Sequence, residues 1–510
     1  MPKFFLTTAI DYANGDPHLG HALEKIGADA IARYRRLRGD DVHFLIGMDE
    51  HGQKVAQTAA ARGLEPQALV DQVAATFEAT WRRLGVSFDQ FIRTTSPGHK
   101  AGVTALVERM FQRSRDDFYE KRYEGWYCVG CELFKRDDEI VDGKCVLHPT
   151  RELQWAEETN WFFRLTRYQE FLKRLFAERP DFLEPATRRN EILSLLESGL
   201  EDISITRSRL AWAIPFPEPT SAGETQGTWV WFDALPNYLT ATGYPDEVFT
   251  RLWPADLHVI GKDITRLHCV IWPAMLESAG LALPGRVWAH GFVQVSGERF
   301  SKSAGVKVEL AEAVDRHGPD AFRYFLLREV GFESDGNFSW ERFDERYTAD
   351  LADGLGNLAS RALQMLVKYR EGRVPDTPAD TSLDAAGQEA TRAYAEAMDA
   401  FDLRRGAEAF GSLVTTANLF IQQTAPWALA KAGREAELDQ ALAALARCLW
   451  RLAVLVSPFL PGKAEELWAA LGQAGSAARA PWDALAGPPV AGATVRKPEN
   501  LFPKSLQSNT

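Results

Sequence analysis

The sequence predicts an α/β domain with a doubly wound, parallel sheet, a second domain inserted into it, and an all-α helix bundle after it. Two apolar, β-rich runs at 3–10 and 42–48 enclose an amphipathic helical pattern, which is the order of a strand–helix–strand unit with buried strands. From about residue 116 to 228 this alternation gives way to aromatic residues and a cluster of Cys and His. Beyond about residue 348 the apolar residues recur almost wholly at helical spacing.

Within the sheet domain, the first predicted helix has one apolar face, and Gly39 is placed to end it. That face consists of Leu23, Ile26, Ala30, Tyr34 and Leu37. Two more helices are expected over 52–62 and 66–84. Sheet-like segments return after the insertion, and we expect them to complete the same sheet; they are Trp229–Phe232, Leu257–Ile260 and Arg286–His290.

The predicted bundle opens with a stripe of apolar residues on one helix face, namely Leu351, Leu355, Leu358, Ala362, Met365 and Tyr369. Long helical stretches follow near 382–424 and 438–456, and prolines separate them. After Pro481 the chain is rich in Pro, Gly and Ala, so we expect an irregular tail.

Composition and charge restrict the class of protein. The chain of 510 residues is 45% hydrophobic and 25% charged, as in soluble globular proteins, and its length implies roughly three or four domains. Its net charge of −12 argues against indiscriminate coating of nucleic acid but leaves recognition by local patches open. No apolar run reaches the roughly 18 residues of a membrane span, and Met1–Thr8 is too short for a signal peptide. We therefore expect a cytoplasmic protein with no membrane partner.

Three of the cysteines lie close together in the inserted region. Cys128 and Cys131 are separated by two residues, as are Cys145 and His148, and a loop joins the two pairs. Three thiolates and one imidazole at this knuckle spacing complete a tetrahedral zinc shell. Because protein fills all four positions, the pattern predicts a structural Zn²⁺ rather than a catalytic one. The alternative is a chance cluster of reduced cysteines.

The segment His18-Leu19-Gly20-His21 follows the first strand, at the start of the next helix. Ligands bind at the carboxyl ends of strands in such sheets, and helix N-termini attract phosphate. Gly20 would let an adenine ring approach the backbone, and the two imidazoles could neutralise charge that develops on a phosphoryl group. The alternative is a loop with two solvated histidines.

A second candidate site lies far along the chain, in Arg299-Phe300-Ser301-Lys302-Ser303. A lysine on a loop flanked by glycines and rich in serine suits a mobile clamp on pyrophosphate. By itself the segment is better explained as an exposed basic turn. Together with the histidine pair it indicates nucleotidyl transfer, in which ATP loses pyrophosphate and a carboxylate gains AMP.

Many ordered segments of the chain, from about Phe4 to Pro503, resemble the methionyl-tRNA synthetase family, a class I family, in its form with one four-ligand zinc knuckle. Besides the histidine segment, the matching residues are Thr7-Thr8-Ala9-Ile10, Tyr12-Ala13-Asn14-Gly15, Asp49-Glu50-His51-Gly52, Trp229-Val230-Trp231-Phe232-Asp233-Ala234, Gly261-Lys262-Asp263-Ile264, Trp272-Pro273-Ala274-Met275, Leu355-Gly356-Asn357-Leu358-Ala359-Ser360-Arg361 and Pro426-Trp427.

The resemblance implies a methionine–tRNA ligase with a Rossmann-like catalytic domain. Such an enzyme activates L-methionine with ATP, releasing pyrophosphate, and then transfers methionine to the 3′-terminal adenosine of tRNA(Met), including the initiator. The resemblance also implies one structural Zn²⁺ per chain and Mg²⁺ that arrives with ATP. Longer relatives append a dimerising domain near the point where this chain ends, so a monomer is expected.

The resemblance assigns roles to individual residues. The implied catalytic residues are His18, His21 and Lys302. The implied ATP-binding residues are His18, Gly20, His21, Glu24, Gly261, Asp263, Ile264 and Lys302. The implied methionine-binding residues are Ile10, Tyr12, Asp49, Trp231, Ala234, Tyr238 and His268, of which Tyr12 and His268 could offer hydrogen bonds to the sulfur. The implied anticodon-binding residues are Asn357, Arg361 and Trp427, and the implied zinc ligands are Cys128, Cys131, Cys145 and His148.

The boundaries that follow from the pattern and the resemblance are 1–115 and 229–295 for the two halves of the catalytic domain, 116–228 for the inserted connective domain with the zinc knuckle, 296–348 for the signature loop and stem-contact region, 349–480 for the anticodon-binding bundle and 481–510 for the tail. The signature loop begins Arg299-Phe300 where the family usually has Lys-Met. Asp11 and Leu267 stand where many members have larger or apolar residues.

Three other readings remain open. A sibling synthetase for leucine, isoleucine or valine would carry a much larger editing insert, for which this chain has no room. The altered signature loop is compatible with a catalytically silent RNA-binding paralogue. A simple adenylyltransferase would not need the bundle with Asn357, Arg361 and Trp427. Methionine-dependent exchange between ATP and pyrophosphate separates these readings.

Overall fold

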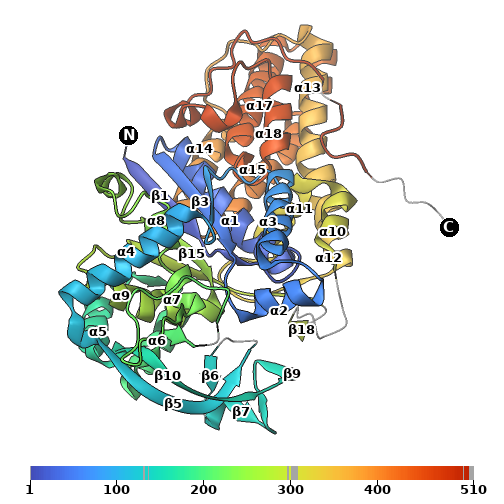
Figure 1. Ribbon diagram of the computed structural model, residues 1–510. Coiled ribbons are helices and arrows are strands. Elements are labelled where there is room, and N and C mark those ends of the chain that lie inside the picture. Colours follow the sequence, from blue (N-terminus) through green and yellow to red (C-terminus); the bar gives the residue numbers. More distant parts are fainter. Residues whose placement is uncertain are drawn as a thin grey trace, which may run out of the picture.

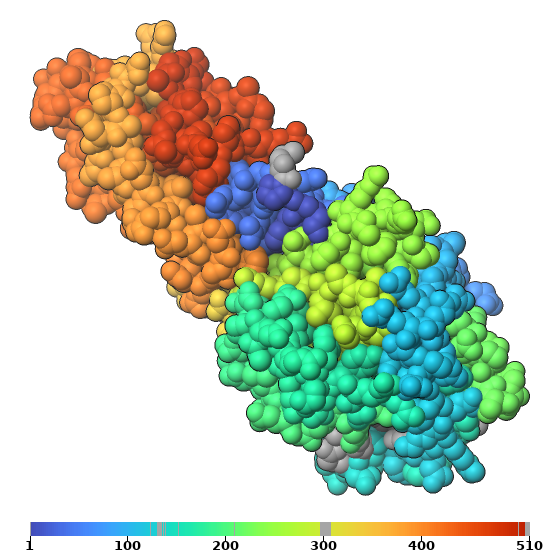
Figure 2. Space-filling view, turned by 90° about the vertical axis from the view of Figure 1, so that its left-hand side faces the viewer, coloured from blue at the N-terminus to red at the C-terminus, as the bar shows by residue number. Residues whose placement is uncertain are grey.

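The computed structural model describes residues 2–129, 133–135, 137–208, 210–295, 298–299, 308–497 and 499–504. It is elongated, with the helix bundle at one end and the inserted sheet at the other, and the parallel sheet lies between them (Figures 1 and 2). In the described residues, no helix is long and apolar enough to cross a membrane.

The central sheet has seven strands, and every pairing in it is parallel, which confirms the predicted α/β class. The strands are β1 (Lys3–Thr8), β2 (Asp11–Tyr12), β3 (Asp41–Asp49), β4 (Gln90–Arg93), β11 (Leu183–Glu184), β15 (Leu257–Gly261) and β16 (Arg286–His290). Their order is β11-β16-β15-β1-β3-β2, and β4 also pairs with β3. The strands predicted near 3–10, 42–48, 257–260 and 286–290 are all present.

The two faces of the sheet belong to two separate cores, because successive side chains of a strand point to opposite faces. Phe4 and Leu6 pack with α1 (Leu19–Leu37) and α3 (Pro66–Arg83), in a core that continues into the bundle. Phe5 belongs to the other core, with α4 (Pro97–Arg113), α9 (Trp272–Ala279) and aromatic residues of the insertion. The sheet is therefore covered on both faces. The core on one face continues into the bundle, and the core on the other face includes residues of the insertion.

The insertion is built on a long antiparallel pair, β5 (Phe118–Cys128) with β10 (Gln154–Phe163), which is flanked by β6 (Leu133–Lys135) and β12 (Ile203–Ser204). A smaller sheet holds β7 (Ile140–Val141), β8 (Lys144–Cys145) and β9 (His148–Glu152). Helices α5 (Gln169–Glu178) and α6 (Ala186–Ser198) follow. Strand β11, which lies between these two helices, joins the edge of the central sheet beside β16.

One predicted strand is wrong. Residues Trp229–Phe232 do not return to the sheet: β14 (Gly227–Thr228) pairs with β13 (Thr206–Arg207), and the chain then turns into helix α7 (Val230–Ala234) and α8 (Asn237–Thr240). The run is apolar throughout, and such a short run reads the same for a buried strand and a buried helix. Val230 and Ala234, four residues apart, are both buried, as the helix requires.

The connection from sheet to bundle begins with a small sheet of β18 (Glu298–Arg299), β17 (Val293–Val295) and β19 (Gly336–Phe338). Helices α10 (Leu310–His317) and α11 (Pro319–Phe325) lie beside it. Helix α12 (Trp340–Arg346) then runs through π-helical turns at Tyr347–Gly356 into α13 (Asn357–Arg370). The remaining helices are α2 (Gln53–Ala61) in the sheet domain and, in the bundle, α14 (Ser382–Asp399), α15 (Leu403–Thr424), α16 (Pro426–Lys431), α17 (Glu435–Val456) and α18 (Pro461–Ala470).

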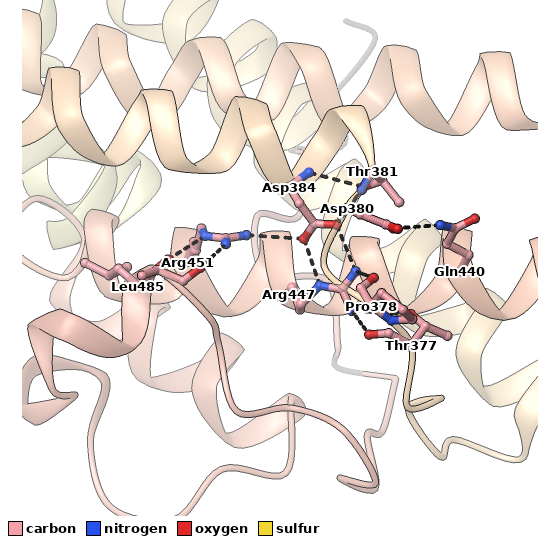
Figure 3. A network of polar contacts seen from close by, with 10 residues as sticks. Thr377, Pro378, Asp380, Thr381, Asp384, Gln440, Arg447, Arg451 and Leu485 are labelled. Atoms are coloured by element: carbon pink, nitrogen blue, oxygen red, sulfur yellow. Dashed lines mark hydrogen bonds and ion pairs between the residues drawn. The ribbon is translucent and has the colours of Figure 1, made fainter.

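A buried carboxylate ties the bundle to its tail (Figure 3). Asp384 caps the first turn of α14 together with Thr381, and it accepts two hydrogen bonds from Arg447 of α17, at 2.7 and 2.8 Å. Arg451, one turn further along α17, lies 3.7 Å from the same carboxylate and donates to the carbonyl of Leu485 at 2.8 Å. Arg447 thus joins α17 to the start of α14, and Arg451 fixes the irregular tail against the helices.

Candidate active site and metal centre

A cleft of about 270 Å³ opens at the carboxyl ends of β1, β15 and β16, the edge where parallel sheets bind ligands. The structure brings nine of the predicted site residues to its walls, namely Ile10, Tyr12, His18, Gly20, His21, Glu24, Gly261, Asp263 and Ile264. They come from segments more than two hundred residues apart in sequence. The six other wall residues were not predicted as site residues; they are Ala9, Asp11, His290, Gly291, Phe292 and Val293. The expected end of the strand at His290 was the signal that could have found the last four.

The histidine pair is organised by the start of α1. The His18 ring accepts hydrogen bonds at Nδ1 from the backbone N–H groups of Gly20 and His21, at 3.1 and 3.4 Å, so it caps the helix. The His21 ring accepts at Nδ1 from the N–H of His18 at 3.3 Å. The two rings stack with centroids 3.6 Å apart. Because each Nδ1 accepts, the neutral rings carry their proton on Nε2, which makes both Nε2–H groups donors.

Gly20 lies close against the His18 ring. A Cβ at Gly20 would lie 3.1 Å from Cε1 of His18, which is tighter than nine in ten real Cβ contacts. A larger residue here would need the His18 ring to shift by a few tenths of an ångström, so the glycine suits the cap as well as access to the cleft.

Beneath the cleft lies a cluster of buried charges. The ammonium of Lys25 lies 2.7 Å from Glu24 Oε1 and 3.0 Å from Asp11 Oδ1, and Nε2 of His290 lies 3.2 Å from Glu24 Oε2. Burial raises the pKa of Asp11 to about 7, against the opposing effect of Lys25. Burial would also raise the pKa of Glu24, but Lys25 and His290 hold it below its ordinary value.

Asp49, the predicted partner of the substrate ammonium, ends β3 opposite Tyr12 of β2 and is 3% exposed. The residues that follow it are fixed from several elements. Glu50 accepts a hydrogen bond from Arg93 Nε at 2.6 Å, and its carbonyl accepts from Trp212 Nε1 at 2.6 Å. This frame leaves the turn after β3 little freedom.

The predicted side-chain pocket lies on α7, α8 and the π-helical turns at Leu267–Ile271. Tyr238 and His268 are buried, and the Tyr238 hydroxyl lies 2.7 Å from Nε2 of His268. Nδ1 of His268 lies 3.0 Å from the carbonyl of Ile264, a wall residue of the cleft, so Nδ1 carries the proton and Nε2 accepts from Tyr238. Burial lowers the pKa of His268 to about 4, which keeps the ring neutral. Trp231, half-buried on α7, packs in the same core as Tyr12, while Ala234 is buried at the end of that helix.

Three of the four predicted zinc ligands converge. The ligand atoms of Cys128, Cys145 and His148 lie within 4.8 Å of one another, and Cys128 Sγ is 3.8 Å from His148 Nδ1. A tetrahedron with zinc bonds of about 2.1–2.3 Å has edges of about 3.7 Å, so the donor set and its spacing fit zinc. Cys131 lies outside the described residues. The other described cysteines, Cys269 and Cys448, are buried and form no disulfide.

The predicted anticodon residues lie on the bundle, away from the cleft. Asn357 is exposed at the start of α13, and Arg361 follows one turn later, half-buried. Trp427 is 48% exposed on α16. Both helices pack against α17. Lys302 and Phe300 lie outside the described residues, and Arg299 ends β18.

A second cleft, of about 480 Å³, lies between the inserted sheet and the π-helical turns. Its walls include Trp229 and both signs of charge: the basic residues are Lys121, Arg207 and Arg266, and the acidic ones are Glu139, Glu201 and Asp202. It therefore adjoins the first cleft without being part of it.

The chain matches two family models and many known proteins. Residues 4–151 and 137–363 match the model for class I (M) tRNA synthetases, and residues 373–509 match the anticodon-binding domain of methionyl tRNA ligase. It is 41% identical to the methionine–tRNA ligase of Brucella suis over 99% of both chains, and 41% identical to that of Synechocystis over 92% of this chain and 90% of the relative. Its fold superposes with a TM-score of 0.92 and 40% identity on Mycobacterium tuberculosis methionyl-tRNA synthetase in complex with methionyl-adenylate, covering 99% of this chain and 100% of the other. The chain belongs to the methionyl-tRNA synthetase family of class I.

Proposed function

We propose that this chain is a methionine–tRNA ligase that activates L-methionine with ATP and transfers it to the 3′-terminal adenosine of tRNA(Met), including the initiator. The observation that carries the proposal is the convergence of nine residues from distant segments on one cleft, with a stacked pair of imidazole donors at its wall.

In the first step, an oxygen of the methionine carboxylate attacks the α-phosphorus of ATP in line, and the bond to the β-phosphate breaks. Pyrophosphate leaves with the electron pair, and methionyl-adenylate remains. The protein contributes positioning and stabilisation of charge. The Nε2–H groups of His18 and His21 are placed to donate to phosphate oxygens, and Lys302 supplies a cation for the leaving pyrophosphate. Mg²⁺ that arrives with ATP would neutralise part of its charge.

Methionine is held at both ends. The carboxylate of Asp49 pairs with the substrate ammonium, and the backbone of Ile10 contacts the amino acid. The side chain, which is apolar and unbranched, enters a pocket with aromatic walls and few polar groups. Its proposed walls are Tyr12, Trp231, Ala234, Tyr238 and His268. On the nucleotide side, Gly261, Asp263 and Ile264 at the end of β15 join Gly20 and Glu24 of α1.

In the second step, the terminal ribose hydroxyl of the tRNA attacks the carbonyl carbon of methionyl-adenylate, and AMP leaves. We assign the second cleft to the unpaired 3′ end, because its aromatic side chains suit the stacking of unpaired bases and it adjoins the side-chain pocket. At the other end of the molecule, Asn357, Arg361 and Trp427 suit unstacked anticodon bases, through contacts to base edges and by stacking.

The insertion holds Zn²⁺ through Cys128, Cys131, Cys145 and His148. With four protein ligands, the metal would fix the small sheet of β7, β8 and β9 rather than take part in the reaction.

The test is methionine-dependent exchange of labelled pyrophosphate into ATP. We expect exchange with methionine and none with leucine, isoleucine or valine. In Lys302→Ala we expect the rate of exchange to fall far more than the affinity for methionine. An unchanged rate in that variant would remove Lys302 from the mechanism, and no exchange by the unaltered chain would favour the silent RNA-binding paralogue.

A further inference from the structure

We infer that Lys25 and Asp11 form a positioning pair that holds Glu24 and the end of β1 in place around the nucleotide. The inference rests on the function proposed above, since it gives the pair a role in the ATP-dependent first step. Lys25 does not line the cleft, whereas Asp11 does, and neither has been given a role in binding or catalysis so far. Both are buried, at 0% and 5% exposure, where a charged side chain is costly unless it is paired.

The ammonium of Lys25 donates all of its hydrogen bonds to residues that line the cleft. It donates to the carbonyl of Ala9 at 2.8 Å, to Oδ1 of Asp11 at 3.0 Å and to Oε1 of Glu24 at 2.7 Å. An ammonium has three donors, so none is left over. All three acceptors belong to residues that line the nucleotide cleft, although Lys25 itself does not. A single side chain thus ties the segment after β1 to helix α1.

Glu24 is held from its other side as well. Its Oε2 faces Nε2 of His290 at 3.2 Å, and Nδ1 of His290 lies 2.7 Å from the carbonyl of Gly291. Since a carbonyl only accepts, Nδ1 is the donor to Gly291, and Nε2 faces Glu24. Both carboxylate oxygens of Glu24 therefore have a partner, Lys25 on its own helix and His290 at the end of β16. This fixes the direction of the carboxylate before any nucleotide binds.

Stability alone does not account for the lysine. Replacing a buried ion pair by apolar side chains of similar size is often neutral or stabilising, so an apolar pair would fill this space equally well. A second buried pair on the same helix provides a comparison. Asp29 accepts from Arg33 at 2.7 Å and lies 2.7 Å from Arg323, and the other acceptors of Arg323 are the carbonyls of Leu84, Pro458 and Phe459. That pair joins α1 to the bundle and contacts no wall of the cleft.

The experiment compares Lys25→Met with Asp29→Asn in methionine-dependent pyrophosphate exchange. In Lys25→Met we expect the KM for ATP to rise about tenfold or more, the loss expected for one charge-assisted contact, while the KM for methionine stays within about twofold. Asp29→Asn, which also loses a buried ion pair, should lower the thermal midpoint of unfolding but leave the KM for ATP unchanged.

The double variant Asp11→Ala/Lys25→Met separates positioning from stability. Removing both charges should recover part of the thermal midpoint lost in Lys25→Met, since Asp11 no longer leaves a carboxylate without its cation and Glu24 keeps its contact with His290, but the KM for ATP should stay high. The inference is overturned if Lys25→Met leaves the KM for ATP unchanged, if Asp29→Asn raises it equally, or if the double variant restores it. Failure of the unaltered chain to exchange pyrophosphate would instead overturn the proposed function, so the two failures are distinguishable.

Discussion

Nδ1 of His51 lies 2.8 Å from Oδ2 of Asp233, and this contact joins the turn after β3 to helix α7. The other oxygen of Asp233 lies 3.0 Å from Nε2 of His99 on α4. All three side chains are buried. Asp49 lies two residues before His51, and Trp231 lies two residues before Asp233, so the carboxylate links the turn beside the proposed partner of the substrate ammonium to the helix that carries a proposed wall of the side-chain pocket.

This link predicts a selective effect on methionine. Asp233→Ala leaves two buried imidazoles without their acceptor, and we expect the KM for methionine in pyrophosphate exchange to rise about tenfold, with the KM for ATP nearly unchanged. Asp117→Ala is the control, because Asp117 is also buried and accepts from Ser278, but it lines neither cleft. Equal rises in both Michaelis constants would show that Asp233 acts on the fold as a whole.

Discrimination between methionine and norleucine, its hydrocarbon analogue, tests the pocket. Both ring nitrogens of His268 are engaged, by Ile264 and Tyr238, so we expect the hydroxyl of Tyr12 to meet the sulfur. Tyr12→Phe should lower the ratio of kcat/KM for methionine over norleucine by about fivefold. If His268→Ala lowers the ratio and Tyr12→Phe does not, the contact belongs to His268.

The dependence of stability on pH tests the burial of Asp11. Its pKa is raised from the ordinary 3.8 to about 7, so between these values the folded chain binds more protons than the unfolded one. The free energy of unfolding should therefore fall as pH rises from about 4 to 7, by up to about 1.4 kcal/mol per pH unit from this group. Denaturant unfolding at a series of pH values should show a shallower fall in Asp11→Asn. Parallel curves for the two proteins would contradict the raised pKa.

The metal centre is tested by measuring the zinc content of the protein rather than its activity. Cys145→Ser should reduce bound zinc, measured by atomic absorption on purified protein, and should expose the insertion to proteolysis, because metal binding stabilises such small sheets. Cys448→Ala is the matched control, since Cys448 is buried in α17, and it should retain the zinc content of the unaltered chain. Equal zinc in all three proteins would exclude Cys145 as a ligand.

If the bundle residues bind the anticodon, their loss should affect aminoacylation of tRNA but not activation of methionine. Asn357→Ala and Trp427→Ala should raise the KM for tRNA in aminoacylation by about tenfold or more and leave pyrophosphate exchange unchanged, since base stacking contributes about 1–3 kcal/mol per base. Glu396→Gln, at an exposed position of α14, should change neither rate. Normal charging by Trp427→Ala would remove that side chain from the interface.

Much of the site was predictable because its parts are local. The histidine pair is three residues apart at the start of a helix, so its stack follows from helical geometry, and the zinc pairs are set by short spacings. The short run at Trp229–Phe232 was wrongly predicted as a strand because nothing within it distinguishes the two buried conformations. Strand β11 was missed because only its partner in the central sheet makes it a strand.

The amino-acid order alone determined the class of fold, the order of its parts and the Cys/His spacing that suits zinc, because periodicity and motif spacing operate over a few residues. The residues for methionine and RNA were implied by the resemblance to the family. Only the folded chain decided which buried charges meet. His51 and Asp233 are 182 residues apart, and His290 and Glu24 are 266 apart. Such pairs form when helices and strands close around a core, and the cost of burying an unpaired charge then selects the partners.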